Sequence, residues 1–145
     1  MGTFTGVVTM GSTNVALPTI AEHFRTDLPT TQWVVIGETL AISALLLPMV
    51  RLSDIVGRKQ VYITGLVIFV LAAAMAGLSS NMPTLIISKI VQGCGSAMTQ
   101  GTSIAIITSV FPTAERGKAL GTHMAVVGSG GLTGPVLGGL LVSHV

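Results

Sequence analysis

The sequence predicts an all-α integral membrane protein with five transmembrane helices, and three observations lead to this prediction. Half of the 145 residues are hydrophobic, only 8% are charged, and the mean hydropathy is +0.82. Long, nearly uncharged runs alternate with short charged connections, and each run is long enough to cross a hydrocarbon core of about 30 Å. The runs also lack the sustained alternation of a membrane strand.

The first two expected spans contain polar residues that a lipid-facing helix would not favour. Residues 3–21 carry no charge but include several hydroxyls and Asn14, and the charged residues 22–25 bring this run to its end. After a short turn, Trp33 opens the second span, 33–50, because its amphipathic ring suits a membrane interface. Glu38 is the one charged residue inside this second span.

The other three expected spans complete a single partial N-terminal transmembrane domain that covers residues 1–145. Residues 61–79 are uncharged, and a connection containing Pro83 leads to the fourth span, 84–110, which includes Lys89. A second charged turn at residues 113–118 precedes the fifth span, 119–143.

The distribution of Lys and Arg predicts the orientation in the cell membrane. The turns after the second and fourth spans hold Arg51, Arg58, Lys59, Arg116 and Lys118, whereas those after the first and third hold only Arg25. Cytoplasmic loops are enriched in basic residues, so we expect the N-terminus to be cytoplasmic.

Several classes of function are excluded by what the composition lacks. There is no basic patch with interleaved aromatics, so we expect no nucleic-acid partner. The single Cys94 rules out an internal disulfide. Nothing resembles a metal site, a nucleophile–base pair or a phosphate loop, so we expect neither an enzyme nor a bound cofactor.

Glu38, Lys89 and Asn14 fall at comparable depth in three different spans. A charge near a helix centre costs about 2.5–3.5 kcal/mol on insertion scales. One hypothesis is that the three form a polar cluster facing a water-filled cavity. The alternative is that Lys89 snorkels outward and that Glu38 is protonated or capped locally.

The last expected span contains a glycine pattern. Gly130, Gly134 and Gly138 recur every fourth residue and leave one helix face without side chains, which favours close contact with a partner helix. Pro135 removes one helical hydrogen bond and predicts a bend, so this helix could instead act as a hinge.

Three motifs together resemble the N-terminal part of a major facilitator superfamily transporter, most closely the fourteen-helix drug:proton antiporters. The first motif is similar to the superfamily's loop signature through Leu52, Asp54, Gly57, Arg58 and Lys59. The segment from Lys89 through Gln92 to Gly95 resembles the fourth-helix pattern R-x-x-Q-G-x-G. The pattern G-x-x-x-G-P-x-x-G-G matches in full, from Gly130 through Gly134, Pro135 and Gly138 to Gly139.

The resemblance implies alternating-access export of drugs or other small amphipathic compounds, driven by the proton gradient and without a cofactor. Asp54 and Arg58 would then latch the cytoplasmic side. Lys89, with Gln92 as a further candidate in the polar cluster, would serve proton coupling, and the glycine-rich helix would set bending and direction.

Three positions depart from the family pattern. Thr9 stands where the first-helix motif usually has an acidic residue, and Lys89 replaces Arg and so lacks a planar fork. Glu38 stands where an aromatic residue is more usual, and we hypothesise that it supplies the missing carboxylate.

Five spans amount to an incomplete N-terminal half of a major facilitator fold. We therefore expect a truncated portion whose partners are the lipid bilayer, a small-molecule substrate and the missing C-terminal half, and we expect it not to transport alone. The alternatives are a portion of a metabolite symporter or uniporter, and a non-transporting membrane protein that modulates a full-length transporter.

Overall fold

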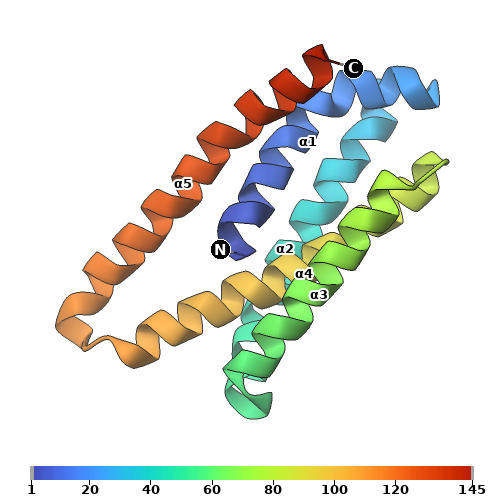
Figure 1. Ribbon diagram of the computed structural model, residues 1–145. Helices are drawn as coiled ribbons and strands as arrows, with labels where there is room; N and C mark the ends of the chain where they lie inside the picture. Colours follow the sequence, from blue (N-terminus) through green and yellow to red (C-terminus); the bar gives the residue numbers. More distant parts are fainter. Residues whose placement is uncertain (1, 145) are drawn as a thin grey trace.

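The computed structural model describes residues 2–144, which form five α-helices and no strand (Figure 1). They are α1 (Gly2–Phe24), α2 (Leu28–Val56), α3 (Arg58–Gly77), α4 (Met82–Val110) and α5 (Thr113–Ser143). Consecutive helices run in alternating directions, so the α2–α3 and α4–α5 connections lie at one end of the bundle. The α1–α2 and α3–α4 connections lie at the other end (Figure 1).

Helix packing places α4 at the centre of one group and pairs α1 with α5. α4 makes its most extensive contacts with α2 and α3, whereas the most extensive contacts of α1 are with α5. Glycines allow these close approaches, since a Cβ atom on Gly95 of α4 would lie 2.7 Å from the carbonyl oxygen of Gly65 on α3. Helix backbones come this close in membrane proteins when small residues line the contact.

Among the described residues, α2, α3 and α5 are long and apolar enough to cross a membrane. Length and composition therefore directly support three of the five predicted membrane spans. α1 and α4 are also long, but they carry more hydroxyl and amide side chains. Many of the polar residues of α4 are buried inside the bundle, where lipid does not reach them.

The polar side chains of α1 bond back to their own helix. Thr9, Ser12 and Thr13 donate their hydroxyls to the carbonyl oxygen four residues earlier at 2.8–2.9 Å. The amide of Asn14 donates to the Met10 carbonyl oxygen at 3.1 Å. Through these bonds, the polar side chains of α1 have hydrogen-bond partners within the same helix, which a low-dielectric environment requires.

The connections are shorter than the sequence predicted. Residues 51–59, which we expected to form a turn, are helical except for Gly57, and residues 113–118 belong to α5 rather than to a turn. Between α1 and α2, only residues 25–27 lie outside the helices. The prediction equated charge with a turn, whereas Lys, Arg and Glu are good helix formers.

Gly57 makes the abrupt α2–α3 connection possible. Its φ of 116° and ψ of 128° lie in a region that side chains disfavour, although no atom within 4 Å would obstruct a Cβ there. The conformation, rather than the available space, therefore requires glycine at this position.

Candidate functional site: a buried ion pair between three helices

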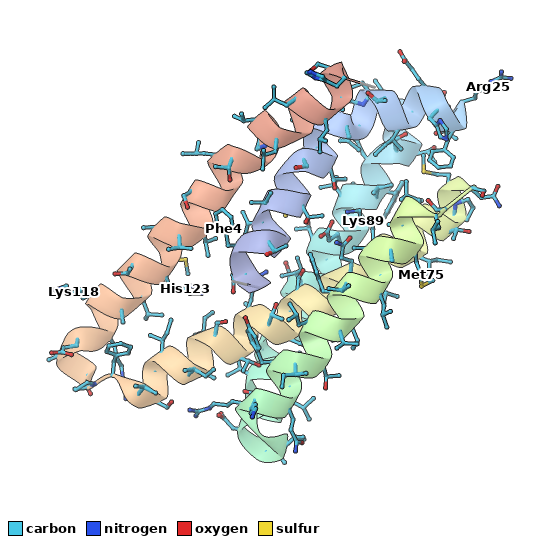
Figure 2. All side chains as sticks on the ribbon, in the orientation of Figure 1. Phe4, Arg25, Met75, Lys89, Lys118 and His123 are labelled. Carbon is cyan, nitrogen blue, oxygen red and sulfur yellow. The ribbon has the colours of Figure 1, made fainter. Side chains whose placement is uncertain are left out.

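The centre of the bundle contains a buried ion pair. Glu38 of α2 and Lys89 of α4 have side chains that are only 1% and 8% exposed, and Lys89 Nζ lies 3.7 Å from Glu38 Oε2. Lys89 also donates a hydrogen bond of 3.0 Å to the hydroxyl of Thr13 on α1. Figure 2 shows Lys89 in the middle of the bundle, whereas Arg25 and Lys118 lie at opposite ends.

Glycines beside the ion pair bring α2 and α4 together. A Cβ on Gly93 would lie 2.6 Å from the carbonyl oxygen of Glu38, and a Cβ on Gly37 would lie 2.9 Å from Ile90 Cγ1. The two backbones can approach this closely because neither position carries a side chain. The close approach places both charged groups inside the protein, away from water and lipid.

Several polar atoms near the pair have no hydrogen-bond partner among the described residues. They are both carboxylate oxygens of Glu38, both amide atoms of Gln92 and the hydroxyl oxygen of Ser96. Leaving a buried polar group unsatisfied costs about 1–3 kcal/mol. Such groups are uncommon in native proteins, and their presence together points to a function or to bound water.

Apart from the two Glu38 oxygens, which belong to α2, the unpartnered atoms lie on α4, which carries a line of polar residues along α1. Its contacts run antiparallel: Lys89 bonds to Thr13, Ser96 Oγ lies 3.4 Å from where a Cβ on Gly6 would be, and Ser103 Oγ lies 3.4 Å from Thr3 Oγ1. We call this line the polar seam, made of Lys89, Gln92, Ser96 and Ser103 of α4 with Thr3 and Thr13 of α1.

The structure brings together two of the three residues predicted to cluster and leaves out the third. Asn14 is exposed and bonds within α1, so its neighbour Thr13 contacts Lys89 instead. Successive residues point about 100° apart around a helix, so a shift of one residue changes the face. The alternative in which Lys89 snorkels outward is wrong, because its side chain is buried beside Glu38.

Three hollows of about 460–540 Å³ are lined by residues other than the ion pair. One of about 530 Å³ lies between the end of α4 and the start of α5, and residues including Phe111, Lys118 and His123 line it. His123 is half-buried there, at the basic end of the bundle.

The glycine stripe of α5 is a tight helix contact, as one of the two interpretations predicted. Gly130, Gly134 and Gly138 are buried against α1, and a Cβ on Gly134 would lie 2.8 Å from the Val8 carbonyl oxygen. Ser12 donates its hydroxyl to the Gly134 carbonyl oxygen at 2.9 Å. α5 is continuous through Pro135, so the hinge interpretation stays a prediction. Gly139 lies off the stripe, and a Cβ added there would meet no atom within 4 Å.

The basic connection between α2 and α3 forms a small polar network at its end of the bundle. Arg58 donates to Asp54 Oδ1 through Nη2 at 3.0 Å and through Nε at 3.3 Å. Its Nη1 donates to the hydroxyl of Ser109 on α4. Lys59 is exposed, and the corner between α2 and α3 is tied to the end of α4 through Arg58.

Comparison with known proteins identifies the family. The family model described as Major Facilitator Superfamily matches residues 1–145. The chain belongs to this superfamily. The recognition from the three motifs is confirmed, and the superfamily consists of membrane transporters rather than enzymes.

Relatives within the superfamily differ in what they are named for. The chain is 37% identical over 144 residues to the riboflavin transporter RibZ of Clostridioides difficile, covering 99% of this chain and 32% of the relative. It is 36% identical over 132 residues to the multidrug resistance protein Stp of Mycobacterium tuberculosis, covering 90% and 25%. The tetracenomycin C resistance and export protein of Streptomyces glaucescens is 31% identical over 141 residues, covering 96% and 26%.

The chain therefore spans about a quarter to a third of the length of these superfamily relatives.

The seam residues Thr3, Thr13, Ser96 and Ser103 were not predicted from the sequence. A signal for them was present, because the polar residues of α4 recur at spacings of three, four and seven and so share one helix face.

Proposed function

We propose that this chain forms part of a secondary active transporter that exports small amphipathic compounds in exchange for protons. The observation that carries the proposal is the buried Glu38–Lys89 pair beside unpartnered polar atoms. Ionisable residues inside a membrane bundle are costly and are typical of proton relays and transport pathways. Membership of a transporter superfamily offers a functional reason for keeping an ion pair that is energetically costly to bury.

We infer further that all five helices cross the cell membrane with the N-terminus cytoplasmic. The two polar helices, α1 and α4, run through the same bundle as the three apolar ones (Figure 1). The basic residues other than Lys89 and Arg25 lie towards the end that contains the α2–α3 and α4–α5 connections. This asymmetry supports a cytoplasmic position for that end.

The export direction is supported by relatives and by one motif. Two of the relatives described above are named for drug resistance or export, and α5 carries the complete glycine–proline pattern. Substrate binding and the latching role of Asp54 and Arg58 would involve a further half of the transporter as partner, because members of this fold hold substrate between two halves.

Transport of a metabolite is a second candidate function, and one observation favours it. The relative with 37% identity is named as a riboflavin transporter, and its match covers nearly all of this chain. A vitamin of that kind is itself an amphipathic heteroaromatic compound, so the two candidates differ in substrate and direction rather than in the type of machinery.

A chimera can test the proposal. These residues would replace the matching segment of the drug efflux pump JefA of Mycobacterium tuberculosis, which is 31% identical to this chain. We expect cells making the chimera to export a fluorescent cationic dye, and we expect a protonophore to abolish that export. The same chimera carrying Lys89→Met, which removes the buried cation, should lose proton-dependent export when the two proteins are compared at equal amounts in the membrane.

Two results would contradict the proposal. Dye export that continues at full rate after the proton gradient is collapsed would remove proton coupling. Riboflavin uptake by the chimera, without dye export, would favour the metabolite candidate instead.

A further inference from the structure

Glu38 is in an unusual position among the acidic residues of this protein. The chain has five Asp and Glu residues, and Glu22, Asp27, Asp54 and Glu115 are all exposed near the ends of helices. Glu38 alone is buried, with a side chain that is 1% exposed. It is therefore the one carboxylate that a proton could reach only through the interior of the bundle.

The surroundings of Glu38 hold the carboxylate weakly. Neither oxygen accepts a hydrogen bond from any residue between 2 and 144. The distance of 3.7 Å to Lys89 Nζ is too long for a direct hydrogen bond, and Lys89 instead donates to Thr13 at 3.0 Å. An ionised carboxylate at such depth normally needs good pairing and hydrogen bonds to offset its lost hydration.

The charged groups around Glu38 are few and can be named. From α4 the facing group is Lys89, and from α1 the seam contributes Thr13, which does not titrate. α1 has no charged residue before Glu22, and α3 has none after Lys59. Tyr62, the one titratable side chain in the remainder of α3, lies beside Gly2 instead, with its hydroxyl accepting from the Gly2 amide.

We propose that Glu38 is the proton-binding residue of this protein and that Lys89 controls it. In this step one Glu38 oxygen takes a proton from a hydronium ion: an O–H bond of hydronium breaks, an O–H bond to Glu38 forms, neutral water is left, and the net charge of the pair changes from zero to plus one. Lys89 then keeps its hydrogen bond to Thr13 and has no anionic partner.

The inference rests on the proposed function, because it names the group that would carry the coupled proton. It also departs from the family pattern, in which the expected acidic position of the first helix is occupied here by Thr9. Opposing influences act on Glu38, since burial favours the neutral acid and Lys89 favours the anion. A group under two such influences can change its protonation when a neighbouring group moves.

Infrared spectroscopy on the 145-residue chain in lipid nanodiscs tests this proposal without requiring transport. The C=O stretch of a protonated carboxyl is distinct from the bands of a carboxylate. The part of the protonated band that Glu38→Gln removes, measured between about pH 6 and pH 9, belongs to Glu38. We expect the band to grow as the pH falls, to be absent in Glu38→Gln and to be unchanged in the control Glu22→Gln.

A second variant tests the role of Lys89. Removing the cation with Lys89→Met should extend the protonated band to higher pH, because the anion loses its partner. If Glu38→Gln fails to fold, the double variant Glu38→Gln with Lys89→Met removes the band without leaving an unpaired charge.

The outcomes separate this inference from the proposed function. A titrating band that disappears with Glu38→Gln supports the inference even if the chimera moves no dye. No protonated band across the range, or a band that survives Glu38→Gln, overturns it. Proton-dependent export without the band would mean that the proton binds elsewhere, so the proposed function would stand and this inference would fall.

Discussion

The α1–α5 contact and the α2–α4 contact both depend on glycine, yet they enclose different chemistry. Between α1 and α5 the stripe of Gly130, Gly134 and Gly138 brings backbone against backbone, and the Ser12 hydroxyl bonds across to the Gly134 carbonyl oxygen. Between α2 and α4, Gly93 brings the backbones together beside a buried ion pair. Close packing alone therefore does not account for the second contact, because an apolar pair would pack there at lower cost.

The difference indicates two roles for close helix contact in one small bundle. The α1–α5 contact is suited to holding two helices at a fixed distance. The α2–α4 contact is suited to keeping two charges in a defined place away from water. Substitutions at each contact can separate these roles, and we order them by the size of the expected effect.

The largest effect is expected from breaking the ion pair on one side only. Glu38→Ala or Lys89→Ala leaves a buried charge without its partner and should each destabilise the folded chain by about 3–5 kcal/mol. The double substitution should recover part of that loss. Reversible unfolding in detergent micelles measures all three variants, with the exposed Glu22→Ala as control. Equal losses that simply add in the double variant would show that the two side chains do not act as a pair.

A smaller loss is expected at the glycine stripe. The Cβ of Gly134→Ala would lie 2.8 Å from the Val8 carbonyl oxygen and 2.9 Å from Gly11 Cα, both backbone atoms that cannot easily move. Overpacking of this kind costs about 1–3 kcal/mol. Gly139→Ala is the matched control, since no atom lies within 4 Å of its Cβ position. The same unfolding assay should show a loss for Gly134→Ala alone, and equal losses would argue against the stripe.

The smallest effect should distinguish two neighbouring residues of α1. Thr13→Val removes the hydroxyl that accepts from Lys89 and should cost about 0.6 kcal/mol, the average for a side-chain hydrogen bond between membrane helices. Asn14→Ala removes an exposed amide that bonds only within α1, so we expect a smaller change. A larger loss for Asn14→Ala than for Thr13→Val would restore Asn14 to the polar cluster.

The helices and the central charges could be predicted from the sequence because each has a local signal. Uncharged runs predicted the five helices, and Glu38 and Lys89 stood out because charge inside an apolar run is rare. The glycine spacing predicted a close contact because three residues share one helix face.

Other features depended on information that is not local. The choice of Thr13 over Asn14 depends on the rotation of α1 against α4, and one residue of error changes the face. The partner of the α5 stripe is α1, more than a hundred positions away in the sequence, and no pattern in α5 alone identifies it. The charged connections were predicted as turns because charge marks the membrane surface but does not end a helix.

The internal hydrogen bonds of α1 have a consequence for how the protein is made. α1 is synthesised before α5, its main packing partner, and three helices lie between them in the sequence, so α1 is made well before that partner is available. During that time its Thr9, Ser12 and Thr13 hydroxyls already have partners on the same helix. Polar groups satisfied within one helix lower the cost of holding that helix in a low-dielectric environment before its partner is present. Ser12 can then share its hydroxyl with the Gly134 carbonyl when α5 arrives, so assembly requires no earlier bond to be broken.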